Sequence, residues 1–205
     1  TLVYPHVDSN GWWTGIVAYN PADLGCTITI TPYTAAGAAL GPVTHSLAAK
    51  EKYVGAVPGL GLPAETAWFR IDSTRPLTGF ELFGTVPDGR LAAYAAQGGG
   101  GTRTGVFPKI EKNGWTGIAF VNTEAAPAAV TLTAYADSGA VVATRVLFVG
   151  GYAKVVNAAE SIFPQDIASA TYIAYSSDGN VVGFQLNASS DGTMLDGLPG
   201  LAGVE

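Results

Sequence analysis

Cysteine, histidine and charge are all scarce in this chain of 205 residues, which holds one cysteine, two histidines and 13% charged residues. A single cysteine, Cys26, excludes an intrachain disulfide and a multi-cysteine metal site. Two histidines are too few for a zinc site unless acidic side chains complete it. The low charged fraction, against about 25% in an average soluble domain, favours close association over free solubility.

Positive charge is especially limited, with 10 Lys and Arg against 16 Asp and Glu. These basic residues are scattered, whereas a nucleic-acid surface needs a basic patch, so we expect no nucleic-acid partner. No apolar run approaches the roughly 18 residues of a membrane helix, so we expect no membrane insertion. The chain shows no signal peptide and opens at Thr1 with strand-like residues, which fits a processed mature protein or a fragment of a longer one.

Glycine and hydrophobic residues are plentiful, at 27 residues and 48%, and their pattern predicts short strands joined by turns. Residues 26–31 and 130–135 alternate with period two, as half-buried strands do. Turns are predicted at 35–37, 137–139 and 178–180, and a short helical turn near 158–163. About seven strands per hundred residues indicate an antiparallel sandwich.

The sequence also repeats itself. Asn10 to Ile16 returns as Asn113 to Ile118, Asn20 returns as Asn122, and Gly79-Phe80 returns as Gly183-Phe184. We therefore predict an internal duplication that gives two tandem antiparallel β-sandwich domains, Ig-like or jelly-roll-like. The expected boundaries are 1–97 for the first, 98–102 for a flexible glycine-rich linker, and 103–205 for the second.

The repeat acts as a filter for catalytic chemistry, because a reaction performed by both copies would need its reactive side chains twice. When the two copies are aligned, His6 corresponds to Lys109 and Glu81 corresponds to Gln185, and neither His45 nor Cys26 recurs. No nucleophile elbow or calcium loop is present. We therefore expect no catalytic residue, no cofactor and no metal site, although a site confined to one copy passes this filter.

The aromatic residues and the first strand are the candidates for binding. Trp12 and Trp13 stand side by side, against a single Trp115 in the second copy. Adjacent strand residues point to opposite faces, so one of the pair can enter the core while the other meets a sugar ring or a protein partner. Leu2, Val3 and Tyr4 form a candidate strand for pairing with another chain.

These motifs carry a resemblance. The segment Tyr4-Pro5-His6, then Gly11 to Ile16, then Asn20-Pro21, together with its partial return from Phe107 to Asn122, resembles tandem β-sandwich repeat modules of bacterial secreted and cell-surface proteins. The resemblance covers nearly the whole chain and rests on structural residues. It implies an extracellular role in adhesion, scaffolding or assembly, and it carries over no catalytic residue.

The sequence thus predicts an extracellular structural or interaction protein that is not an enzyme and whose partner is a protein, through self-association or attachment to a surface protein. Edge strands of sandwiches can pair with another chain, which supports self-assembly. The alternatives are a carbohydrate-binding module that uses a tryptophan to hold a glycan, or non-catalytic accessory domains of a larger secreted hydrolase.

Overall fold

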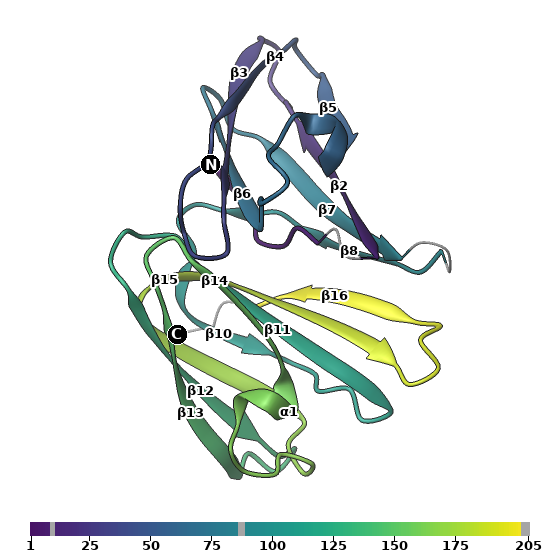
Figure 1. Cartoon of the computed structure of the whole chain (residues 1–205), viewed down its shortest axis with the longest axis vertical. Coiled ribbons are helices and arrows are strands. Elements are labelled where there is room, and N and C mark those ends of the chain that lie inside the picture. The colour runs from purple at the N-terminus through teal and green to yellow at the C-terminus, as the bar shows by residue number, and fades with distance from the viewer. Residues whose placement is uncertain (9–10, 86–88, 202–205) are drawn as a thin grey trace.

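The computed structural model describes residues 1–8, 11–85 and 89–201. Regular structure in these residues is nearly all β, and its antiparallel sheets confirm the predicted all-β sandwich class. Residues 1–98 form the upper part of the molecule, here called the N-terminal half, and residues 99–201 form the lower part, the C-terminal half (Figure 1). No helix in the described ranges has the length and apolar character needed to cross a membrane.

The N-terminal half contains two sheets of antiparallel strands. One has the order β4-β3-β6-β1-β9 and the other the order β5-β2-β7-β8. The elements are β1 (Leu2–Tyr4), β2 (Trp12–Tyr19), β3 (Cys26–Tyr33), β4 (Val43–Leu47), β5 (Lys52–Ala56), η1 (Val57–Leu60), β6 (Trp68–Ser73), β7 (Thr78–Thr85), β8 (Leu91–Ala95) and β9 (Gln97–Gly98).

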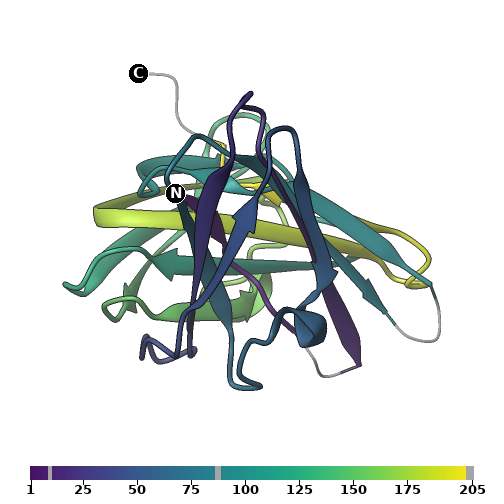
Figure 2. The same cartoon turned by 90° about the horizontal axis from the view of Figure 1, so that it is seen from above.

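The C-terminal half has the strand order β13-β12-β15-β11-β14, and β10 and β16 both pair with β15. Its elements are β10 (Thr102–Phe107), β11 (Gly114–Asn122), β12 (Ala128–Tyr135), β13 (Val141–Val149), β14 (Lys154–Ala158), α1 (Ala159–Ile162), β15 (Tyr172–Ser189) and β16 (Leu195–Pro199). The helical turn α1 lies where the sequence predicts it. Seen from above, the strands of the two halves run across one another (Figure 2).

The strand β15 explains why one half has two sheets and the other a single connected sheet. Its first part, up to Ser177, pairs with β12 and β10, and its second part, from Val181, pairs with β11 and β16. The predicted turn at 178–180 is therefore wrong, because the chain crosses there from one layer to the other without reversing. β15 takes the places of β6 and β7, so both halves pair their strands in the same order. The duplication itself stays a prediction.

Alternation of residue types creates the two cores. In β3, Cys26, Ile28 and Ile30 point inward and the intervening threonines point outward, and β12 alternates in the same way. Each half buries its own apolar cluster between its layers. Asn20 and Asn122 are both fully buried, and each side-chain amide donates hydrogen bonds to two backbone carbonyls of its own half. The recurrence of this asparagine thus has a structural reason.

The glycine run connects the halves without a long linker. Gly98 belongs to β9, and β10 already begins at Thr102. Gly99 and Gly101 have φ of 72° and 90°, which favours glycine. A Cβ on Gly101 would lie 2.6 Å from the Val181 carbonyl oxygen. The run is therefore a tight turn packed against the C-terminal half. The predicted hairpin turns at Gly37 and Gly139 also have positive φ.

The first strand is not free to recruit another chain as it stands. β1 pairs with β6 on one side and with β9 on the other. Leu2, Val3 and Tyr4 are all buried, and the Tyr4 hydroxyl donates to the Val17 carbonyl at 2.8 Å. The backbone groups that the sequence analysis assigned to assembly are therefore already paired within the N-terminal half, and pairing with another chain would require their release.

The halves meet through two buried apolar clusters. In one cluster, Phe83 and Tyr94 of the N-terminal half pack on Phe184 and Leu186 of the C-terminal half. In the other, Trp68 lies with Val121 and Val182. The Trp68 indole N–H donates to the Tyr152 carbonyl across the junction at 2.9 Å. Buried aromatic contacts of this kind fix the relative position of the two halves, and they create the site described next.

Candidate functional site: an aromatic cleft between the halves

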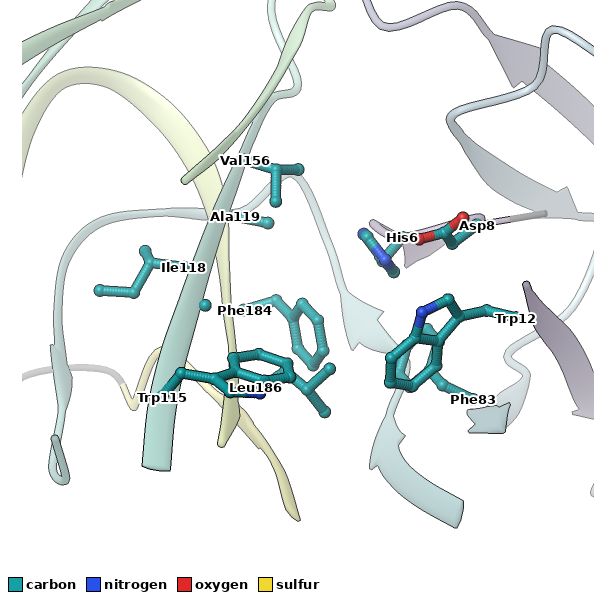
Figure 3. A pocket seen from close by; sticks show the side chains of 11 residues that line it. His6, Asp8, Trp12, Phe83, Trp115, Ile118, Ala119, Val156, Phe184 and Leu186 are labelled. Atoms are coloured by element: carbon teal, nitrogen blue, oxygen red, sulfur yellow. The ribbon is translucent and has the colours of Figure 1, made fainter. Parts of the chain in front are cut away.

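A cleft of about 290 Å³ opens at the junction of the two halves. Trp12 and Phe83 line it from the N-terminal half, and Trp115, Phe184 and Leu186 line it from the C-terminal half (Figure 3). Its volume is at the small end of the range for small-molecule sites, which suits a single ring-sized group. Neither half forms this cleft alone, so the site depends on how the halves pack.

The structure resolves which tryptophans share a site. Trp12 and Trp115 line opposite sides of the cleft, although they come from different halves (Figure 3). Trp13 points to the other face of β2, where its ring lies against Gly15 and Gly84. Trp115 is 37% exposed, and Trp12 and Trp13 are half-buried. The predicted opposite orientation of Trp12 and Trp13 is thus present, and Trp12 is the residue that faces the cleft.

His6 supplies a polar group to this mainly apolar cleft. Its ring lies 5.4 Å from the Phe83 ring and 5.7 Å from the Phe184 ring, measured between centroids. Burial, helped by the positive charge of Lys154, lowers the pKa of His6 to about 3, so the imidazole is neutral at pH 7. Its buried Nδ1 makes no hydrogen bond to any described residue. The His6 ring borders the cleft, whereas this nitrogen is itself covered by protein.

Behind the cleft lie two ionisable residues, one from each half, that interact electrostatically. Glu81 on β7 is fully buried, and its pKa is raised well above the usual value because burial outweighs the opposing effect of Lys154. Lys154 on β14 is half-buried, and this desolvation lowers its pKa to about 8, while its ammonium donates to the Ala67 carbonyl at 2.9 Å. The two side chains, one from each half, therefore interact electrostatically in a low-dielectric region.

The neutral state of His6 predicts an acid sensitivity. The unfolded chain binds a proton at this residue near pH 6.5, whereas the folded chain does so only near pH 3. Stability from this histidine is therefore complete above pH 6.5 and is lost as the pH falls towards 3. Between pH 7 and pH 5 we expect His6 to lower the free energy of unfolding by about 2 kcal/mol, measured by chemical denaturation.

The variant His6→Gln isolates this contribution, because Glu81 and the other carboxyl groups titrate in both proteins. We expect His6→Gln to lose about 2 kcal/mol less than the wild type between the two pH values. An identical pH dependence in His6→Gln and the wild type would show that His6 is not held neutral.

A second cavity adjoins the first and shares two of its residues. It has a volume of about 390 Å³, and it is lined by Trp12, Trp13 and the loop that follows β5. Trp12 and Asp8 line both cavities, so the Trp12 ring stands between them.

No protein-family model and no curated protein matches the chain. Among solved structures, "Crystal Structure of Thermotoga maritima 1070" aligns with a TM-score of 0.39 and 17% identity, over 49% of this chain and 95% of that one. A β-glucuronidase 2 of Bacteroides uniformis aligns with a TM-score of 0.24 and 13% identity, over 91% of this chain and 24% of that one. Both TM-scores are too low to bear on function.

Proposed function

We propose that this chain is a non-catalytic extracellular binding module that holds a sugar ring of a glycan in the cleft between Trp12 and Trp115. The observation that supports it most is the pairing of these two tryptophans, one from each half, on opposite sides of one ring-sized cleft. An extracellular location is part of the proposal and follows from the sequence resemblance.

The chemistry of the cleft fits a sugar better than a wholly apolar group. A sugar ring has an apolar C–H face, which packs on aromatic rings, and a rim of hydroxyl groups. The cleft offers tryptophan and phenylalanine rings together with His6 and Asp8 along one side (Figure 3).

This proposal favours glycan binding over self-assembly, which the sequence alone ranked first. Such a module would serve adhesion in a surface protein, or it would hold a larger secreted hydrolase on its polysaccharide. Both roles use the same cleft, and neither requires a catalytic residue in this chain.

A glycan array followed by calorimetric titration tests the proposal. We expect the wild type to bind at least one class of glycan, and we expect Trp115→Ala and Trp12→Ala each to weaken that binding about tenfold or more, because each removes one stacking surface. Trp115 is partly exposed, so the substitution leaves the core intact. Near-ultraviolet circular dichroism checks the fold of each variant.

Trp13→Ala is the matched control, since it makes the same change one residue along the chain but on the opposite face of β2. Its affinity is expected to stay within about twofold of the wild type. Failure of every glycan to bind, or equal affinity in the wild type and both cleft variants, would contradict the proposal.

A further inference from the structure

Each half carries an almost identical apolar face on the outer side of one sheet. In the N-terminal half this surface, the β2–β7 face, consists of the outward side chains of β5, β2, β7 and β8. Its largest apolar members are Trp13, Val17, Val54, Phe80, Leu82 and Leu91. The positions that match by strand pairing in the C-terminal half are Trp115, Ala119, Val156, Phe184, Leu186 and Leu195.

The two faces differ in whether protein covers them. In the C-terminal half the face packs against the N-terminal half, and Phe184 is 2% exposed. In the N-terminal half the matching Phe80 is 40% exposed, and Leu91 is 52% exposed. The contact covers the centre of the C-terminal face only, because Val156 at its edge is 49% exposed, much like the matching Val54 at 56%. At the centre, the phenylalanine that forms a buried contact in one half thus stands open to solvent in the other. Contiguous apolar surfaces of this kind mark interaction sites.

The β2–β7 face is suited to pack against another sheet. Lys52, at one edge, is the only charged residue among its outward positions on the four strands. The Trp13 ring lies over Gly15 and Gly84 instead of standing up from the sheet. Two such low, uncharged surfaces can stack face to face, as the sheets of a sandwich do at about 10 Å.

Head-to-tail stacking of copies does not fit the residues. Within the chain, the apolar face of the C-terminal half is covered by one end of the sandwich of the N-terminal half. This end presents Phe83 and Ala92. The matching end of the C-terminal half presents Asn187 and Asp196 instead. Asp196 is hydrogen-bonded there to Asn187 and ion-paired with Lys109. This polar end would have to lose its hydration against an apolar surface, so it is a poor occupant of the β2–β7 face.

We infer that the β2–β7 face binds the same face of a second copy, so that the protein forms a two-fold symmetric dimer through its N-terminal halves. A two-fold contact needs only a self-complementary surface, and an apolar sheet with no central charge meets that need. The interface lies on the side of β2 opposite to Trp12, so it leaves the cleft between the halves unobstructed. It is independent of the ligand.

Sedimentation velocity and light scattering of the full chain test this inference. We expect a mass of twice 20.9 kDa at high protein concentration, with reversible dissociation on dilution. Phe80→Lys places a charge at the centre of the face and is expected to raise the dissociation constant about 100-fold or more. Val54→Lys, on the neighbouring strand β5, is a second variant at an exposed position and is expected to act in the same way.

Phe148→Lys is the matched control, because Phe148 is 78% exposed on β13 in the C-terminal half. This variant is expected to dimerise like the wild type. A wild type that stays monomeric up to about 1 mM would overturn the inference and would leave the face to a different protein. A dimer that survives both Phe80→Lys and Val54→Lys, or one that Phe148→Lys dissociates, would overturn it as well.

Discussion

Replacement of Lys154 by methionine is expected to lower the free energy of unfolding by about 3 kcal/mol at pH 7.5. The Lys154 ammonium comes from the C-terminal half, and its positive charge favours the ionised form of the buried Glu81 in the N-terminal half. Tyr94 and the backbone of His6 also favour the ionised carboxylate, but burial disfavours it more. Without the cation, Glu81 must either remain charged in an apolar region or keep its proton at a pH where the unfolded chain has released it.

The cost of Lys154→Met is expected to grow with pH, and this dependence separates a charge effect from lost packing. Burial already raises the pKa of Glu81, and removal of Lys154 raises it further. The unfolded chain releases this proton near pH 4.5. As the pH rises above that value, the folded variant therefore becomes less stable relative to its unfolded state. We expect a clearly smaller loss at pH 5 than at pH 7.5, measured by urea denaturation.

Two further variants complete the test of the charged pair. The double variant Glu81→Gln with Lys154→Met is expected to recover to within about 1 kcal/mol of the wild type, because a neutral pair needs no compensating charge. The matching residue Gln185 is fully buried, so this fold already accepts glutamine there. Lys52→Met replaces the exposed lysine that matches Lys154 in the N-terminal half. It is expected to lower the free energy of unfolding by about 0.5 kcal/mol or less. Equal losses at both pH values, together with no recovery in the double variant, would refute the pairing.

Phe184→Ala is expected to destabilise the chain by about 3–5 kcal/mol, as truncation of a fully buried phenylalanine does. The Phe184 ring lies 4.8 Å from the Tyr94 ring and 5.2 Å from the Phe83 ring, both of which belong to the other half. Its removal leaves a void in the contact that positions the halves. Thermal and chemical denaturation measure the loss, and glycan binding in the cleft is expected to weaken with it.

Phe80→Ala provides the comparison for Phe184→Ala, since Phe80 holds the matching place in the N-terminal half and is 40% exposed. We expect it to cost about 1 kcal/mol or less in the free energy of unfolding of the monomer. Equal costs for the two substitutions would mean that Phe184 does not lie in a buried contact between the halves, and the geometry of the cleft would then be wrong.

Much of the fold could be predicted from the sequence because local patterns determine it. The alternation of residue types in β3 and β12 predicts which side chains are buried, and Gly37 and Gly139 predict the turns that follow these strands. The segment 178–180 misled because Asp, Gly and Asn favour turns in general. Here the Asp178 carboxylate accepts the Ala129 backbone N–H at 2.7 Å, and Asn180 donates to Glu124. These contacts with distant residues hold a crossing between layers, which no local pattern reveals.

The candidate site was only half predictable, for a different reason. Tryptophan is a recognisable binding residue, so Trp12 and Trp115 could be named from the sequence, but nothing in it shows that they meet. His6 and Glu81 were set aside because Lys109 and Gln185 replace them in the second copy. The requirement that a functional residue recur in both copies applies only to a site that lies within each half. A site between the halves needs each residue once, so the differences between the copies were the useful signal.

The most direct test of the cleft is an NMR titration that follows the indole N–H signals of the four tryptophans as a bound glycan is added. The Trp68 indole is hydrogen-bonded to Tyr152 inside the junction and serves as an internal reference. We predict that the Trp12 and Trp115 signals shift together along one binding curve, while the Trp68 and Trp13 signals stay in place. Shifts confined to Trp13, or shifts of Trp12 and Trp115 with different affinities, would contradict a single shared site between the halves.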